Sequence, residues 1–93
     1  MKYKGEMFRN GRVVSQGYFD GTHPKEVVRK ILKNKKPMNS LIYIVNEYGE
    51  LWAYSIKNNN GKYFVRPMKS KNALNQDDLD LVFMGKKKII DFV

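Results

Sequence analysis

Two Asn-Gly pairs, Asn10-Gly11 and Asn60-Gly61, constrain the fold of this 93-residue chain more than any other feature. Each pair separates two runs in which apolar and polar residues alternate, which is the pattern of a half-buried strand. Asn-Gly is the preferred sequence for a two-residue type I′ turn, because both central residues of that turn need a positive φ. The sequence therefore predicts two tight antiparallel hairpins.

The first predicted hairpin consists of the runs Lys2–Arg9 and Arg12–Phe19. A two-residue turn between these runs also sets the register of the two strands. The predicted cross-strand pairs are Arg9 with Arg12, Phe8 with Val13, Met7 with Val14, and Tyr3 with Tyr18.

A helix is predicted directly after this hairpin. Thr22 or His23 is the expected N-cap, and Pro24 falls in the first turn, where its missing N–H costs nothing. The helix is expected to end near Asn34, before the helix-breaking Pro37. Its apolar stripe, at helical spacing, consists of Val27, Val28, Ile31 and Leu32.

A three-stranded meander is predicted from Leu41–Val45, Leu51–Lys57 and Lys62–Pro67. Gly49 is expected to adopt the left-handed conformation in the loop between the first two strands. The turn at Asn60-Gly61 fixes the other register, in which Ile56 faces Val65, Lys57 faces Phe64 and Ser55 faces Arg66.

Alternation along these three strands sorts their side chains onto two faces. The first face is nearly free of charge and is predicted to be the core side beneath the helix; it carries Ile42, Ile44, Trp52, Tyr54, Ile56, Tyr63 and Val65. The second face is mixed, becomes cationic toward the Asn-Gly turn, and is expected to face solvent or a partner; it carries Leu41, Tyr43, Val45, Ser55, Lys57, Lys62, Phe64 and Arg66.

The C-terminal segment allows two interpretations. Asp77 and Asp78 would suit the first turn of a helix, whose dipole favours negative charge there, and Gly85 would suit its end. However, 78–83 also partly alternates like a strand, and 88–93 has the pattern of a second strand. The segment is therefore predicted to form either a helix or a hairpin.

These elements predict an α+β fold of order β-β-α-β-β-β followed by that segment, in a single domain covering residues 1–93. No run of residues approaches the roughly 20 apolar positions of a membrane span, and the N-terminus lacks the apolar core of a signal peptide. The chain has no cysteine. We expect a cytoplasmic protein without a membrane partner.

The sequence contains few residues that are typical of a catalytic or metal site. His23 is the only imidazole and fits the start of a helix, so no zinc site is expected. Asp77, Asp78 and Asp80 are too close in sequence to converge readily on one Mg²⁺, and a negatively charged helix start explains them more simply. We predict a non-enzymatic protein with no catalytic residues, no metal and no cofactor.

The formal net charge of +9, from eighteen Lys and Arg against nine Asp and Glu, predicts an anionic partner. The abundance of Lys, Asn, Ile and Tyr matches AT-rich codons, so genome composition is an alternative source of part of the lysine excess. Codon bias does not explain the arrangement, because residues 57–71 contain no acid.

The leading hypothesis is a small nucleic-acid-binding or nucleoprotein-associated domain. Its cations would contact phosphates while Tyr43 or Phe64 stacks on bases, and the predicted contact residues are Arg9, Arg12, Tyr43, Lys57, Lys62, Phe64 and Arg66. A secondary basic patch is predicted at Arg29, Lys30, Lys33, Lys86, Lys87 and Lys88. Lys25, Lys35 and Lys36 add to the charge of the first helix and its exit.

The competing hypothesis is a protein-interaction module that docks on an acidic protein surface. Such a module would be an adaptor, or a small inhibitor from a phage or mobile element with an AT-rich genome. Open edge strands would also permit strand addition or a homodimer.

Overall fold

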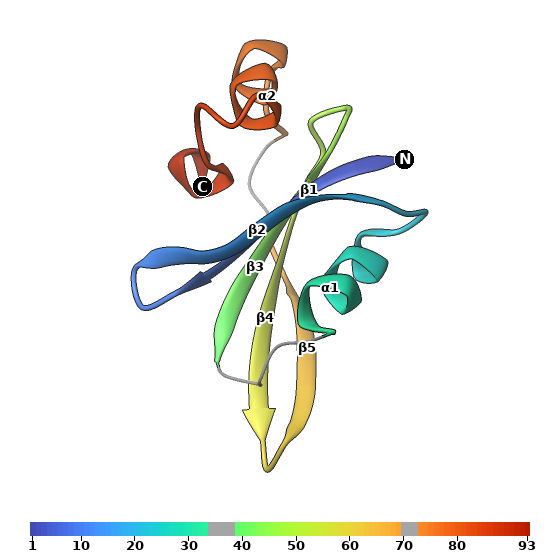
Figure 1. Ribbon diagram of the computed structural model, residues 1–93, viewed down its shortest axis with the longest axis vertical. Helices are drawn as coiled ribbons and strands as arrows, with labels where there is room; N and C mark the ends of the chain where they lie inside the picture. The colour runs from blue at the N-terminus through green and yellow to red at the C-terminus, as the bar shows by residue number, and fades with distance from the viewer. Residues whose placement is uncertain (34–38, 70–72) are drawn as a thin grey trace.

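The computed structural model describes residues 1–33, 39–69 and 73–93. Its framework is a five-stranded antiparallel sheet of order β2-β1-β3-β4-β5 (Figure 1). Helix α1 (Pro24–Leu32) joins the first hairpin to the meander, and α2 (Gln76–Phe83) and the 3₁₀ helix η1 (Ile89–Phe92) follow the last strand. The strands are β1 (Lys2–Arg9), β2 (Arg12–Asp20), β3 (Ser40–Asn46), β4 (Leu51–Asn59) and β5 (Lys62–Met68). The predicted α+β class and element order are confirmed.

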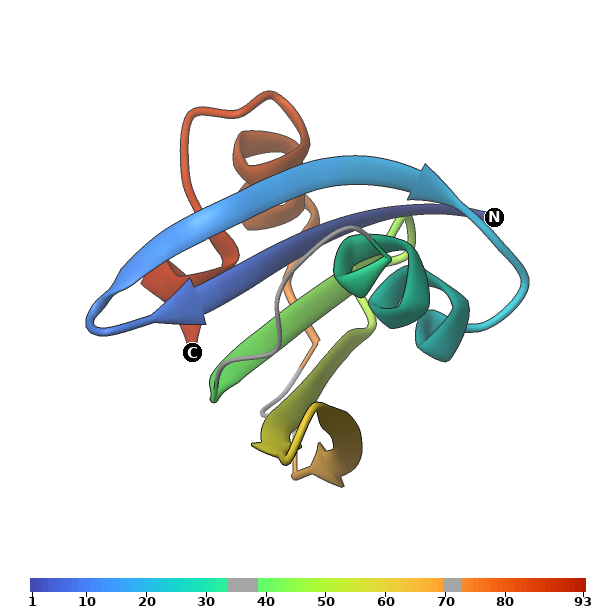
Figure 2. The same cartoon turned by 60° about the horizontal axis from the view of Figure 1, so that its bottom comes forward.

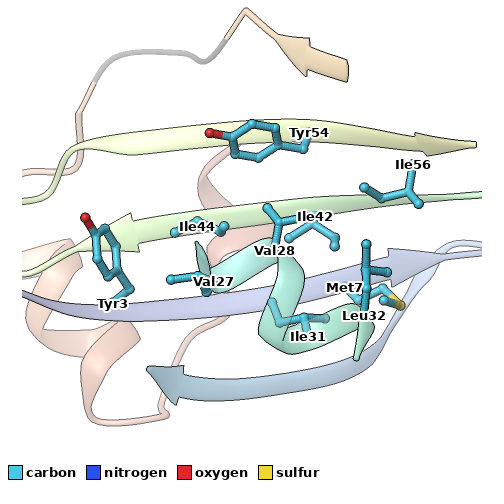
Figure 3. Packing of buried hydrophobic residues seen from close by; sticks show 10 residues of the cluster. All are labelled: Tyr3, Met7, Val27, Val28, Ile31, Leu32, Ile42, Ile44, Tyr54 and Ile56. Atoms are coloured by element: carbon cyan, nitrogen blue, oxygen red, sulfur yellow. The ribbon is translucent and has the colours of Figure 1, made fainter. Parts of the chain in front are cut away.

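The two faces of the sheet are covered by different helices. Helix α1 lies on one face, and α2 with η1 lies on the other (Figure 2). The α1 side is the larger core, where the helix stripe meets β1, β3 and β4 (Figure 3); its buried members are Tyr3, Met7, Val27, Val28, Ile31, Leu32, Ile42, Ile44, Tyr54 and Ile56. Trp52 and Tyr63 pack against this cluster, so the predicted core face of the meander is confirmed for all its residues except Val65, which is 37% exposed on the edge strand β5.

Glycine at position 5 permits the close packing of α1 on β1. A Cβ at Gly5 would lie 2.6 Å from the Cδ1 atom of Ile31 and 3.2 Å from a methyl of Val27. Distances this short would force the side chains of the helix to move. The absence of a side chain at Gly5 therefore sets how closely the helix approaches the sheet.

The first hairpin has the predicted turn but a different register beyond it. Arg9 faces Arg12 and Phe8 faces Val13, as predicted. A bulge between Met7 and Phe8 then shifts the pairing by one residue, so Met7 faces Ser15 instead of Val14. The predicted Tyr3–Tyr18 pair is wrong for the same reason, since Tyr3 faces Phe19.

Helix α1 begins as the sequence indicates. His23 is the N-cap, and its Nδ1 accepts a hydrogen bond of 3.1 Å from the Lys25 amide. Pro24 occupies the first turn. The helix continues to Leu32, with Lys33 at its C-cap, and the predicted end near Asn34 lies outside the described residues, as do Lys35 and Lys36.

The meander matches its predicted register. Ile56 faces Val65, Lys57 faces Phe64 and Ser55 faces Arg66. Gly49 has the predicted positive φ of 86° in the loop between β3 and β4. That loop is tied by the buried side chain of Asn46, whose Oδ1 accepts hydrogen bonds from the amides of Tyr48 and Glu50 at 3.0 and 2.9 Å.

The C-terminal segment is helical. Asn75 caps α2 through its Oδ1, which accepts a 2.9 Å hydrogen bond from the Asp78 amide. At the other end Gly85 has the expected positive φ, and the Lys86 amide donates to the Leu81 carbonyl, which closes a Schellman motif. The strand considered for 88–93 is wrong, since Ile89–Phe92 forms η1.

The described parts of the chain contain no helix long and apolar enough to cross a membrane.

Candidate functional site

The sheet face opposite α1 is divided into a covered half and an open half. The C-terminal segment packs over β1, β3 and the start of β4, and its cluster buries Val45, Leu51, Leu79, Val82 and Ile89. No helix of the described residues covers the rest of this face, toward β5 and the two hairpin turns (Figure 1). The second face predicted for the meander is thus only partly available to a partner.

A buried ion pair on β1 holds the covered half together. Glu6 is fully buried, and its Oε2 lies 3.2 Å from the Nζ of Lys4, which is also buried. Both carboxylate oxygens of Glu6 accept from the Ile89 amide at 2.8 Å, at the start of η1. The Nζ of Lys4 donates to the Val82 carbonyl at 3.0 Å, at the end of α2. One ion pair therefore anchors both helices of the segment.

Tyr18 adds a third contact to this anchor. Its hydroxyl donates a 2.6 Å hydrogen bond to the Phe83 carbonyl, next to the carbonyl that Lys4 contacts. The Nζ of Lys4 also lies 5.8 Å from the centroid of the Tyr18 ring. Positive charge and donors thus meet the carbonyl end of α2, and the carboxylate of Glu6 meets the amide end of η1.

Tyr43, one of the two predicted stacking residues, lies in the covered half. It is partly buried against the cluster beneath α2 and η1, and this burial raises its pKa above 10.0. Less of its ring is exposed to a ligand than the prediction requires, because it packs against the cluster of the C-terminal segment. The prediction that Tyr43 is an exposed contact residue does not fit its position, because the sequence did not reveal what covers it.

The open half contains two adjoining hollows, which together we call the basic groove. The first hollow has a volume of about 330 Å³ and extends from Arg9 and Asn10, at the tip of the first hairpin, to Lys57. The second has a volume of about 390 Å³ and extends from Lys57 to Lys69. Ser55 and Lys57 line both hollows, so the two hollows adjoin at these residues.

The basic groove combines apolar walls with cationic rims. Its apolar part comes from neighbouring strands and consists of Phe8, Leu41, Ile56, Pro67 and Met68. Its cations are Arg9, Lys57, Arg66 and Lys69. No carboxylate lines either hollow, and within the described residues Lys57, Arg66 and Lys69 form no ion pair.

Phe64 stands beside this groove on the exposed edge strand. It faces Lys57 in the register of β4 and β5, and alternation puts it on the same face as Lys62 and Arg66. The side chain of Phe64 is 55% exposed, a large exposed aromatic surface among cations. Of the two predicted stacking residues, Phe64 is the more exposed.

The two arginines of the first hairpin have different positions. Arg9 is half-buried, lines the groove, and donates through Nη2 to the sulfur of Met7 at 3.6 Å. Arg12 faces Arg9 across the turn, is exposed, and lines neither hollow. The register therefore keeps the predicted arginine pair but brings only Arg9 to the groove.

The predicted secondary patch separates into two places. Arg29, Lys30 and Lys33 are exposed on α1, where the Nζ of Lys30 donates to the Asp20 carbonyl. The lysines at 86–88 occupy the turn between α2 and η1, at the opposite end of the molecule from the β4–β5 turn (Figure 1). Because α1 lies on one face of the sheet and α2 with η1 on the other (Figure 2), the two groups do not form one surface.

Helix α1 brings part of its charge to β5. Lys25, Val28 and Arg29 line a hollow of about 150 Å³ together with Val65. Val65 and Phe64 are consecutive on β5 and point to opposite faces. The edge strand thus has cations on both sides, an arrangement that neither segment shows in the sequence.

In the described residues no group of three His, Cys, Asp or Glu side chains is placed to hold a metal ion. Asp80 instead accepts a 2.8 Å hydrogen bond from Gln76, and Asp91 accepts one of 2.9 Å from the Lys88 amide. The carboxylates at the C-terminal helices thus serve as helix-start and side-chain acceptors.

Comparison with protein-family models, with curated proteins and with solved structures found no match to this chain.

Proposed function

We propose that this protein binds nucleic acid through the basic groove, without catalysing a reaction on it. The observation that carries the proposal is that Arg9, Lys57, Arg66 and Lys69, from three parts of the chain, line two adjoining hollows to which no described carboxylate contributes. Such a surface suits a polymer that carries a negative charge on every repeat.

The energy of such binding comes from the phosphates. Each cation that neutralises a phosphate releases a counterion, which makes binding sequence-independent and sensitive to salt. The cations of the groove suit this role because most are exposed and form no ion pair with a described residue. Lys57, Arg66 and Lys69 therefore need not break an ion pair with a described residue before they contact a ligand.

The proposal is tested by fluorescence anisotropy with labelled DNA and RNA oligomers of mixed sequence, at about 50 mM salt, where counterion release favours binding. The double variant K57Q/R66Q should bind more weakly than the wild type. Its plot of log K against log salt should be shallower by about 1 for each removed phosphate contact.

A matched control removes two lysines from the distant turn. K86Q/K87Q lowers the net charge by the same amount but leaves the groove intact. It should retain most of the affinity. Absence of binding to every oligomer, or equal losses in the two double variants, would contradict the proposal.

A protein partner is the second candidate, and the exposed edge of β5 favours it. Val65 and Met68 are 37% and 46% exposed there, although Pro67 lacks the N–H needed for full strand pairing. Capture from a lysate, with and without nuclease, separates the candidates. A captured protein that survives nuclease and binds the purified chain without nucleic acid would favour the second.

A further inference from the structure

Strand β5 separates two cationic surfaces by the thickness of one strand. On one side lies the basic groove with Lys57 and Arg66, and on the other lies the hollow lined by Lys25, Arg29 and Val65. All of these cations are exposed, and none forms an ion pair with a described residue. In the part of the chain that the structure describes, β5 is the last strand of the sheet, so this edge is open to a ligand.

Glu26, the acidic residue of α1, does not line the hollow that contains Lys25, Arg29 and Val65. Glu26 accepts hydrogen bonds from the hydroxyl and amide of Thr22 at 2.7 and 3.3 Å. These bonds lower the pKa of Glu26 and keep its carboxylate at the start of the helix. Lys25 and Arg29, four residues apart, are neighbours on the helix, and neither forms an ion pair with Glu26.

We propose that the ligand of the basic groove is a single-stranded nucleic acid that wraps around the edge of β5, contacting Lys57 and Arg66 on one face and Lys25 and Arg29 on the other. This inference rests on the proposed function. It adds the class of nucleic acid and a second contact surface.

Stiffness distinguishes a single strand from a duplex at this edge. Duplex DNA has a persistence length of about 150 base pairs, so it stays nearly straight over the width of a small domain. It would lie along one face of β5 and leave the other face without contacts. A flexible single strand can turn around the edge and reach the cations on both sides.

The exposure of Phe64 also favours a single strand over a duplex. The bases of a duplex are stacked inside it, so an aromatic ring on the protein surface meets only sugar and phosphate. The bases of a single strand are free to stack on an aromatic side chain. Phe64, 55% exposed opposite Lys57, offers such a platform between phosphate contacts.

The test compares one single-stranded DNA of about 12 nucleotides, within the usual size of such sites, with the duplex of the same sequence. The wild type should prefer the single strand. K25Q/R29Q should lower the salt slope for the single strand by about 0.7 for each removed contact, and should leave duplex binding unchanged. F64A should weaken single-strand binding about 5- to 150-fold, with little effect on the duplex.

Three other results would overturn the inference. Equal affinity for duplex and single strand, with no effect of F64A, would reject the single strand and leave the proposed function standing. A loss in K25Q/R29Q no larger than in K86Q/K87Q would reject wrapping around β5. Absence of binding to any nucleic acid, together with binding to poly-glutamate, would reject the proposed function itself in favour of an acidic protein partner.

Discussion

On the sheet face opposite α1, Lys4 and Glu6 of β1 are buried beneath α2 and η1, whereas Lys57 and Arg66 on the same face are exposed. The first pair makes an ion pair and hydrogen bonds to both C-terminal helices. The second pair lines the groove without a described carboxylate.

The difference follows from the cost of burying charge. A charged group leaves water only when it is paired and hydrogen-bonded. Burial of Lys4 and Glu6 therefore depends on their hydrogen bonds to α2 and η1, and the same bonds hold both helices on the sheet. Exposed cations have no such requirement and remain available to a ligand. One face of one sheet thus uses charge to fix the fold in one half and, in our proposal, to bind a partner in the other.

The largest expected effect is the loss of the buried pair. E6A leaves the Lys4 ammonium without its carboxylate and the Ile89 amide without its acceptor. The free energy of unfolding should fall by about 3–5 kcal/mol, measured by urea denaturation.

The double variant K4M/E6L controls for the uncompensated charge in E6A. It removes both charges, so no buried charge is left uncompensated. The Ile89 amide loses its acceptor, whereas the Val82 carbonyl loses Lys4 but still accepts from the Gly85 amide, and the loss should be smaller, about 1–3 kcal/mol. A double variant less stable than E6A would show that the ion pair itself contributes more than this comparison assumes.

The next effect contrasts one apolar residue from each half. L79A shortens a side chain on the buried face of α2 that is 3% exposed, and should cost about 2–5 kcal/mol through the cavity that it leaves. F64A changes an exposed residue in the open half and should alter stability by no more than about 0.5 kcal/mol. Similar losses in thermal unfolding would contradict the division of this face.

A smaller effect concerns the charges of the groove in the absence of ligand. K57Q/R66Q should change the free energy of unfolding by about 0.5 kcal/mol or less, because both residues are exposed and lack ion pairs with described residues. Removing two like charges reduces repulsion on this surface, so any change at low salt should be toward higher stability. A marked destabilisation would mean that these residues serve the fold.

The smallest expected effect is on the stability at alkaline pH, where Tyr43 titrates. Burial raises the pKa of Tyr43, so the folded state disfavours its phenolate and stability should fall as pH rises through and above 10.0. Y43F should lessen this alkaline loss and remove one late step from the tyrosinate absorbance. A normal titration of Tyr43 would mean that the C-terminal segment does not cover it.

Local patterns predicted most of the fold. The turns at Asn10-Gly11 and Asn60-Gly61 have the positive φ values that their residues favour, and alternation identified the core face of the meander. The bulge between Met7 and Phe8 escaped prediction, because the turn sets only the first pairs and nothing in the run marks an extra residue.

The C-terminal segment was harder because its conformation depends on distant residues. Ile89 is held by Glu6, 83 positions away, so the local pattern of 88–93 suggested a strand. For the same reason the roles of Lys4 and Glu6 were missed, although two charges at alternate positions of an apolar strand were a visible signal.

The candidate site was predictable in part. The acid-free stretch after position 57 identified Lys57, Phe64 and Arg66, which lie together on one face of the sheet. Covering by α2 and η1 removed Tyr43 from it, and the packing of α1 brought Lys25 and Arg29 to the edge of β5. Both changes depend on packing between segments that are far apart in the sequence, so the pattern of one segment could not predict them.

The most direct measurement is a titration of the isotopically labelled protein with the single-stranded oligomer, followed by backbone amide NMR. We expect shifts at Ser55, Lys57, Phe64 and Arg66, and at the Lys25–Arg29 turn of α1. The amides of Val82 and Ile89, in the covered half, should not move. Shifts confined to 86–88, or spread beneath α2, would contradict the account.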